Sequence, residues 1–302
     1  MTAPPLADTT VRAPARTPAE RLTRLLGRAP VHVALAVVAL VWLLPTVGLL
    51  VTSFRPRADI QNSGWWTIFG GNIDLTLENY ELVLGADLAA QTMLQAFLNT
   101  IQITIPSTII PLLLASMAAF AFAWIKFPFR DTLFLAVIAL LLVPIQMVLL
   151  PLGEIYRDLG LIGSFLPIWI THTTFALPFG IFLLRNFFIT LPKDLIEAAR
   201  IDGATNVGIF RQIVLPLSVP ALASYAIFQF LWVWNDLLIA LVFAPRPAGQ
   251  PMTTQIGSLL GTYGAEWHIL AAASFLVMVV PLAVFFSLQR FFVQGLLAGS
   301  VK

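Results

Sequence analysis

Residues able to do chemistry are few in this sequence, and the densest group of them lies in an apolar stretch. Asn235 and Asp236 directly follow Trp232 and Trp234. Polar groups inside apolar segments are energetically costly and usually face a cavity or a partner. An amide and a carboxylate can hydrogen-bond hydroxyl groups, and indole faces can cover the apolar side of a pyranose ring. We therefore treat these four residues, together with Gln146, as candidates for contact with a hydroxyl-rich solute.

A plainer explanation exists for each of these candidates. The tryptophans would equally suit an aromatic belt at a membrane interface, with Asp236 reaching water beyond it. Gln146 and the polar run Thr171–Thr174 would equally suit hydrogen bonding between helices. Residue types alone leave both explanations open.

Catalytic and metal-binding chemistry is poorly represented. The chain has no cysteine and three histidines, which excludes disulfides, cysteine-ligated metals and a thiol nucleophile. His172 lies in an apolar segment that holds no Asp or Glu, so the segment indicates neither a proton relay nor a metal site. We expect no catalytic residues, no metal site and no cofactor bound by this chain.

The composition indicates an integral membrane protein. Apolar residues make up 59% of the chain and charged residues 11%, against about 25% charged residues in soluble domains. A soluble globule could not bury so much apolar surface beneath a polar coat. The net charge is only +2, so a nucleic-acid partner is not indicated either.

Six stretches free of Asp, Glu, Lys and Arg are long enough to cross a membrane, which takes about 20 apolar residues. They are 29–54, 88–125, 132–153, 159–184, 212–235 and 269–289. The early part of the second stretch is polar, so we expect its helical core at 99–124. Because lipid-exposed backbone must satisfy its own hydrogen bonds, the sequence predicts an all-α, polytopic protein with six transmembrane helices.

The distribution of basic residues predicts the orientation. Thirteen of the seventeen Lys and Arg residues lie on the side that carries both termini, and cytoplasmic loops are enriched in these residues. Both termini are therefore predicted to be cytoplasmic. We expect residues 1–29 to form a flexible cytoplasmic tail, 30–302 to form the membrane domain, and 55–93 to form an external loop with Trp65 and Trp66 at the lipid interface.

The cytoplasmic segment 185–216 carries helix signals of its own. Pro192 suits the first turn of a helix, and Gly203 can adopt the left-handed conformation that commonly ends one. Thr205 can cap a second short helix that runs to about residue 213. Small residues at 198, 199, 203 and 204 would let another backbone approach closely. The pattern predicts a helix–turn–helix docking unit, and its plainer alternative is an amphipathic hairpin on the membrane surface.

The residues of this loop resemble a specific family. Three motifs are similar to the EAA loop of binding-protein-dependent ABC importer permeases: Glu197-Ala198-Ala199, Asp202-Gly203-Ala204 and Ile213-Val214-Leu215-Pro216. The motif is long and its spacing is fixed. The six spans, the outer loop after the first span, the Trp234-Asn235-Asp236 run and the chain end 296–302 resemble the maltose-type carbohydrate branch of that family.

This resemblance implies a type I importer fold and a division of labour. The short helix would be the coupling helix, seated in a cleft of a separate cytoplasmic ATPase, with Glu197 as its anchoring charge and Gly203 as its tight turn. The residues implied in coupling are Glu197, Ala198, Ala199, Asp202, Gly203, Ala204, Ile213, Leu215 and Pro216. The chain has no G-x-x-x-x-G-K-[ST] loop, so a partner dimer of ATP-binding subunits would bind ATP and Mg²⁺.

The implied function is one half of a translocation pore in a bacterial or archaeal cell membrane, for a di- or oligosaccharide such as an α-glucoside. A second, non-identical permease and an extracellular or periplasmic sugar-binding protein would complete the importer. Two rivals remain at this point. A secondary transporter needs buried ionisable residues in mid-span, and Asp236 alone is a poor set. A membrane-embedded enzyme needs paired acid, base or metal-ligating residues at one depth.

Overall fold

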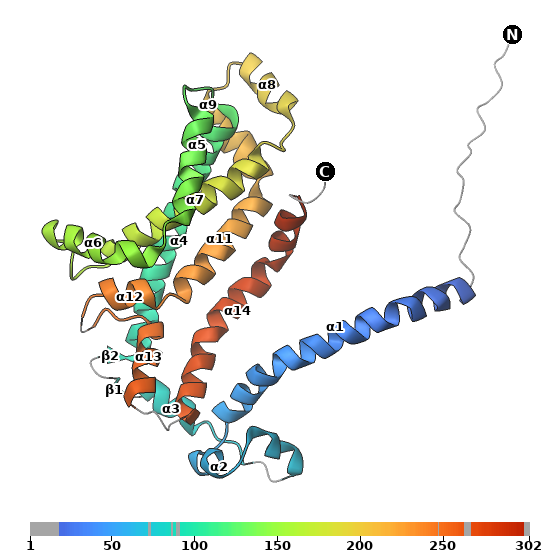
Figure 1. Ribbon diagram of the computed structural model, residues 1–302, viewed down its shortest axis with the longest axis vertical. Helices are drawn as coiled ribbons and strands as arrows, with labels where there is room; N and C mark the ends of the chain where they lie inside the picture. Colours follow the sequence, from blue (N-terminus) through green and yellow to red (C-terminus); the bar gives the residue numbers. More distant parts are fainter. Residues whose placement is uncertain are drawn as a thin grey trace. The chain divides into compact units, whose positions relative to one another are not determined.

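The computed structural model describes residues 18–71, 74–85, 87–88, 91–246, 248–262 and 267–298, and these are almost wholly helical (Figure 1). The chain divides into one unit that ends at Val51 and a second that begins at Thr52. Helix α1, Pro18–Ser53, crosses this boundary. Of the expected tail, residues 1–17 lie outside the described residues, and residues 18–29 form the beginning of α1.

Four helices in the described residues are long and apolar enough to cross a membrane. They are α1, α4 (Met93–Trp124), α7 (Leu166–Phe188) and α14 (Trp267–Ala298). Two further pairs of shorter helices qualify when each bent pair is counted as one span, which brings the total to six. The predicted all-α membrane fold is confirmed, and two of its six spans are broken.

The third span is broken at Pro144. Helix α5, Arg130–Ala139, and a 3₁₀ turn, Leu140–Leu142, precede the break, and α6, Ile145–Asp158, follows it at an angle of 97°. Proline disfavours helical backbone in the residue before it, and Val143 is accordingly extended, with ψ 114°. The single helix expected over 132–153 is therefore wrong, because Pro144 divides it.

The fifth span bends where it leaves the coupling loop. Helix α9, Asn206–Ile209, continues as a π-helical turn, Phe210–Val214, and as α10, Leu215–Leu217. Helix α11, Val219–Trp234, follows at 78°. Pro216 and Pro220 lack the N–H groups that would continue the helical ladder, so the bend falls between them.

The segment predicted to be an external loop is structured. It contains α2 (Arg57–Asn62), the 3₁₀ helix η1 (Trp65–Gly70), α3 (Glu78–Gly85) and two short antiparallel strands, β1 (Asp87–Leu88) and β2 (Gln91–Thr92). In the register of these strands Asp87 lies opposite Thr92. The buried Arg55 guanidinium donates to the carbonyl oxygens of Asp59 and Ser63. That side chain therefore closes the loop on itself.

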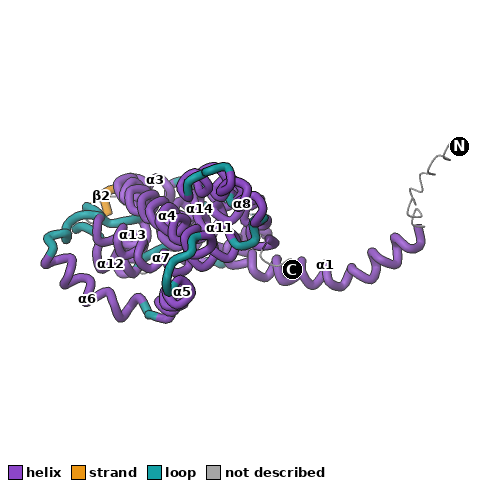
Figure 2. The backbone as a smooth tube through the Cα atoms, turned by 90° about the horizontal axis from the view of Figure 1, so that it is seen from above, coloured by secondary structure: helices purple, strands orange, loops and turns teal. Residues whose placement is uncertain are grey.

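The remaining helices form a bundle around α4. Helix α4 packs against α7 and α11, and α11 packs against α14; these four stay side by side in both views (Figures 1 and 2). Small residues permit the close approach, since Ala115 and Ala119 of α4 are fully buried. At Gly180 of α7 a Cβ atom would lie 2.3 Å from the Tyr225 ring of α11. Helices α12 (Leu238–Phe243) and α13 (Met252–Thr262) connect α11 to α14.

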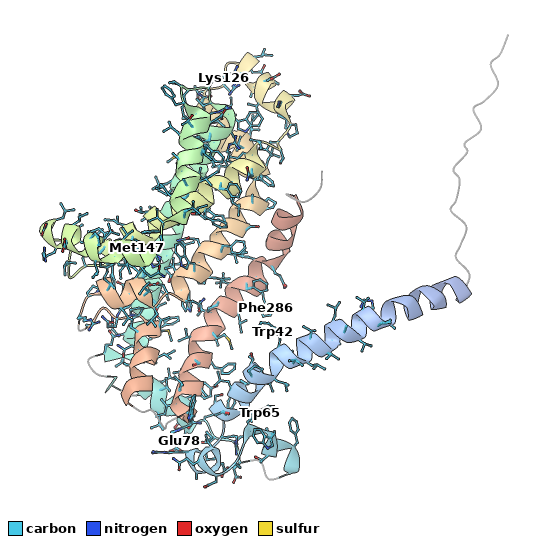
Figure 3. All side chains as sticks on the ribbon, in the orientation of Figure 1. Trp42, Trp65, Glu78, Lys126, Met147 and Phe286 are labelled. Atoms are coloured by element: carbon cyan, nitrogen blue, oxygen red, sulfur yellow. The ribbon has the colours of Figure 1, made fainter. Side chains whose placement is uncertain are left out.

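The two predicted sides of the membrane correspond to opposite ends of the second unit. Lys126 lies at the end that carries α8 (Lys193–Ile201), whereas Glu78 lies at the other end (Figure 3). This separation agrees with the predicted assignment of the loops to alternate sides. Which of the two ends faces the cytoplasm stays a prediction from the basic residues.

Single cysteines test that orientation, because the chain has none of its own. Leu75 and Val207 are 58% and 65% exposed, and they lie in the loops predicted to be external and cytoplasmic. A membrane-impermeant thiol reagent applied to intact cells should label Leu75→Cys. It should label Val207→Cys only after the cells are permeabilised. The reverse pattern would invert the topology.

Candidate functional site

The predicted coupling helix is present and is bounded by the expected residues. Helix α8 follows Pro192, and Gly203 after its end has φ +81°. The Gly203 N–H donates to the Arg200 carbonyl, and the Ala204 N–H donates to the Ala199 carbonyl. This pair of bonds is the Schellman motif, in which glycine at the left-handed position satisfies the last carbonyls of the helix. A side chain at 203 would be strained by the backbone itself.

The second helix of the loop begins as predicted and continues differently. The Thr205 hydroxyl accepts the N–H of Gly208 at 3.2 Å, which caps α9. After Ile209 the backbone changes to the π-helical turn rather than remaining α-helical to residue 213. Isolated π-helical turns are rare overall, and those that occur are often at functional sites. Here the turn joins the loop to the bent fifth span.

One face of the α8–α9 hairpin is attached firmly to the membrane helices. Ile196, Ile209 and Val214 are buried in a core cluster with residues of α4, α7 and α11. The Arg200 guanidinium also donates to the carbonyl oxygen of Trp124, at the end of α4, at 2.7 Å. The hairpin is therefore packed directly against three spans.

The opposite face of the hairpin is open. Glu197, Ala198, Gly203 and Ala204 are exposed, and the Glu197 carboxylate has no hydrogen bond or ion pair with any other described residue. The other predicted coupling residues are Ala199, Ile213 and Leu215, which are partly buried, and Asp202 and Pro216, which are exposed. The loop thus presents the unpaired Glu197 carboxylate among small residues, with Asp202 as a second exposed carboxylate.

A cavity of about 650 Å³ opens beside the broken third span. Its wall comes from the α5–α6 break, α7 and α11, and five of its side chains are aromatic: Tyr156, Phe175, Phe179, Phe228 and Trp232. Thr174 and Gln229 add polar atoms. None of the described residues that line it is charged. A cavity of this size lies within the usual range for small-molecule sites.

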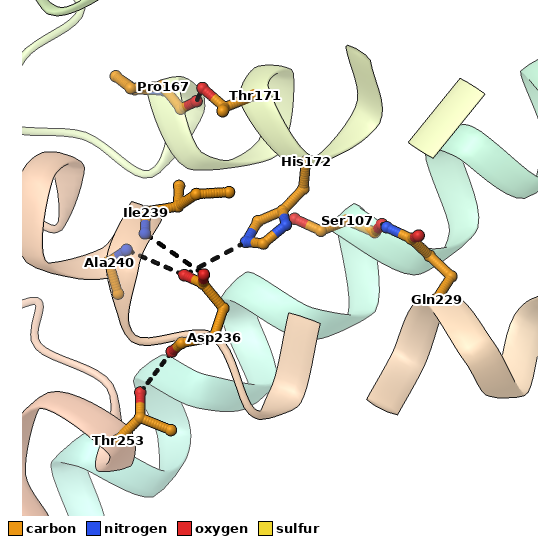
Figure 4. Close-up of polar contacts among 9 residues, drawn as sticks. All are labelled: Ser107, Pro167, Thr171, His172, Gln229, Asp236, Ile239, Ala240 and Thr253. Atoms are coloured by element: carbon orange, nitrogen blue, oxygen red, sulfur yellow. Dashed lines mark hydrogen bonds and ion pairs between the residues drawn. The ribbon is translucent and has the colours of Figure 1, made fainter. Parts of the chain in front are cut away.

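A buried polar pair lies next to this cavity. His172 of α7 is fully buried, and its Nε2 lies 3.7 Å from a carboxylate oxygen of Asp236, which follows α11 (Figure 4). That carboxylate also accepts the N–H groups of Ile239 and Ala240, in the first turn of α12. The His172 ring meets the Trp232 ring edge to face at 5.7 Å. In the described residues no group of three His, Cys, Asp or Glu could hold a metal ion.

Comparison with known proteins decides the family. The sequence profile described as binding-protein-dependent transport system inner membrane component matches residues 108–297, more than half of the chain. The chain belongs to this family. It is therefore an ABC importer permease, and hydrolysis of ATP is the task of a separate subunit.

Curated relatives cover nearly the whole permease. The osmoprotective compounds uptake permease protein GgtD of Synechocystis sp. is 49% identical over 93% of this chain and 95% of its own. The alpha-glucoside transport system permease protein AglG of Rhizobium meliloti is 36% identical over 90% of this chain and 96% of its own.

A solved structure supports the fold. A bacterial ABC transporter that imports the acidic polysaccharide alginate has a chain with a TM-score of 0.73 and 22% identity to this permease. The match covers 93% of this chain and all of that one. At this identity the likeness concerns architecture alone.

The structure separates the five residues singled out for solute contact. Trp232 is 40% exposed and lines the cavity. Trp234 lies in the core instead, where its Nε1 donates to the Val277 carbonyl and its ring stacks on Phe230. Residues two positions apart on a helix point to different faces, so Trp232 and Trp234 of α11 cannot share one surface.

The three polar candidates do not line the cavity. Asn235 donates to the Leu231 carbonyl one turn back, and Gln146 is exposed on α6 and does not line the cavity. The side chain of Asp236 is 10% exposed and serves α12 and His172. It therefore neither reaches bulk water, as the belt explanation required, nor offers its carboxylate freely to a solute.

Sequence reasoning missed Gln229 and the aromatic side chains of α7. Gln229 is the only amide between Val219 and Trp234, and such a residue in a span is a signal in itself. Its Nε2 donates to the Ser107 carbonyl of α4 at 2.9 Å. The pairing of His172 with Asp236 was also missed, since the two lie on different spans.

The role of Asp236 in starting α12 can be measured. Asp236→Ala removes the acceptors of two backbone N–H groups and should destabilise the permease by about 1–2 kcal/mol. Asp236→Asn keeps one acceptor and should lose less stability. Asp158→Ala removes only an exposed partner of Arg157 and should change little. Thermal unfolding of the purified variants in detergent checks this order, and equal midpoints for all three would contradict it.

Proposed function

We propose that this permease forms one half of the translocation pathway for a di- or oligosaccharide, with an α-glucoside as the favoured class. An external binding protein delivers the solute, and a second, non-identical permease and a pair of ATP-binding subunits complete the importer. The observation that carries the proposal is the α8–α9 hairpin, buried on one face and open on the other.

The geometry of the hairpin suits transmission of force. Short helices closed by the Gly203 turn and the Thr205 cap cannot easily deform. Because Ile196, Ile209 and Val214 attach the hairpin to three spans, a push on its open face is transferred to them. The unpaired Glu197 carboxylate offers a partner cation or backbone donor one strong contact.

The relatives and the cavity support the proposed solute class. The names of two relatives specify osmoprotective compounds and alpha-glucosides, and others specify arabinooligosaccharides and melibiose, raffinose and stachyose. The cavity has aromatic faces for the C–H side of a sugar ring and no charged lining residue. These features favour an uncharged glycoside over an acidic or zwitterionic solute. The aromatic wall includes Trp232, which we take as the contact this subunit makes with the solute.

The coupling role predicts the effect of changes on the open face. Glu197→Lys reverses the anchoring charge, and loss of a buried charged contact typically costs about 2–5 kcal/mol. Gly203→Asp strains the left-handed turn. Both variants should insert normally and abolish uptake, and the ATPase should either fail to copurify or hydrolyse ATP independently of solute. Transport and ATPase assays on the reconstituted importer measure this.

Two matched variants serve as controls for that experiment. Gly203→Asn should retain part of the activity, because asparagine tolerates the left-handed conformation better than other residues. Glu78→Lys makes the same charge change at the other end of the molecule and should leave coupling intact. Normal, solute-stimulated ATPase activity and uptake in both Glu197→Lys and Gly203→Asp would defeat the proposal.

The solute class predicts a pattern of competition. Unlabelled sucrose, trehalose and maltose, presented with the cognate binding protein, should compete for uptake into proteoliposomes. A uronate and glycine betaine should not, since they carry charges that the cavity does not neutralise. Competition by betaine alone would replace the sugar assignment with a zwitterionic osmoprotectant.

A further inference from the structure

His172 occupies a position that its packing does not explain. The residue is fully buried between spans, and neither ring nitrogen has a hydrogen bond among the described residues. Burying a polar group without a hydrogen bond is costly. A leucine or phenylalanine would fill the same volume without that cost. The imidazole instead places a ring nitrogen 3.7 Å from the Asp236 carboxylate.

That carboxylate is held by two backbone donors. Its two oxygens accept the N–H groups of Ile239 at 3.3 Å and Ala240 at 3.0 Å. The backbone oxygen of Asp236 accepts the hydroxyl of Thr253, from α13, at 2.6 Å. Asp236 thus joins the end of α11 to α12 and α13, and its charge lies at a fixed place beside α7 (Figure 4).

His172 links this fixed charge to the cavity wall. Its Nε2 faces Asp236 at 3.7 Å, and its ring meets the Trp232 indole at an interplanar angle of 89°. Trp232 is 40% exposed and lines the cavity. An aromatic side chain on a cavity wall is free to rotate unless a neighbour restricts it, and the edge-to-face contact supplies that restriction.

We propose that His172, held by Asp236, is a positioning residue that sets the orientation of the Trp232 indole, and through it the affinity of the pathway for the solute. The inference rests on the proposed function, because it takes Trp232 as a contact with an uncharged glycoside. His172 and Asp236 themselves do not touch the solute. Their effect passes through one indole ring.

A double-mutant cycle on the complete importer tests this chain of contacts. The measurement is the concentration of binding protein loaded with radiolabelled sucrose, trehalose or maltose that gives half-maximal uptake, taken separately from the maximal rate. His172→Leu should raise this concentration roughly three- to tenfold, the range expected for loss of one aromatic contact, with little change in the maximal rate. Trp232→Leu should raise it at least as much.

The decisive comparison is the double variant. If His172 acts through the indole, His172→Leu should have no further effect once Trp232→Leu is present. Asp236→Asn, which keeps an acceptor for α12, should give a smaller shift in the same direction and covers the case in which His172→Leu fails to fold. Trp42→Leu, at a residue 78% exposed on α1, is the control for loss of a tryptophan elsewhere.

The outcomes separate the two proposals. Two results would overturn the positioning role and leave the solute contact standing. One is that the effects of the two leucine variants are additive. The other is that Trp232→Leu shifts the half-maximal concentration, whereas His172→Leu and Asp236→Asn do not. Unchanged uptake in Trp232→Leu would overturn the solute contact and the positioning role together. Loss of solute-stimulated ATPase activity in His172→Leu, with binding unaltered, would assign His172 to coupling and would also overturn the inference.

Discussion

The rest of this permease depends on the packing of one face of the α8–α9 hairpin against the membrane helices. Ile196, Ile209 and Val214 pack into the same cluster as residues of α4, α7 and α11, and Arg200 adds a hydrogen bond to the end of α4. A loop on the membrane surface without these contacts would absorb an applied force by deforming. Because the interior is close-packed, the proposed coupling would pass a displacement of the hairpin on to the spans.

Proline decides where those spans can bend. Pro144 divides the third span, and Pro216 and Pro220 flank the bend before α11. Each removes a backbone donor, and in a membrane the freed carbonyl groups are tolerated only where they are covered by protein or face a cavity. The cavity beside the α5–α6 break is the consequence of the first of these breaks. The break at Pro144 therefore leaves room beside the third span.

The polar side chains inside the spans are few, and Gln229 and Asp236 each contact a neighbouring helix. The amide of Gln229 engages the backbone of α4, and Asp236 engages the start of α12 and faces His172. Placing a carboxylate in apolar surroundings is expensive, and two backbone N–H groups together with the imidazole offset much of that cost. What remains facing the cavity is uncharged and mostly aliphatic, with five aromatic side chains.

Local signals in the sequence were sufficient for the membrane class, the number of spans and the coupling loop. Pro192, Gly203 and Thr205 act through the backbone of their own or adjacent residues, so their positions predicted the limits of α8 and the start of α9. The separation of Trp232 from Trp234, the burial of Asp236 and its pairing with His172 were decided only by the tertiary structure. These depend on which face of α11 meets α7 and on where Pro144 turns the third span, and both are set by packing between segments that lie far apart in the chain.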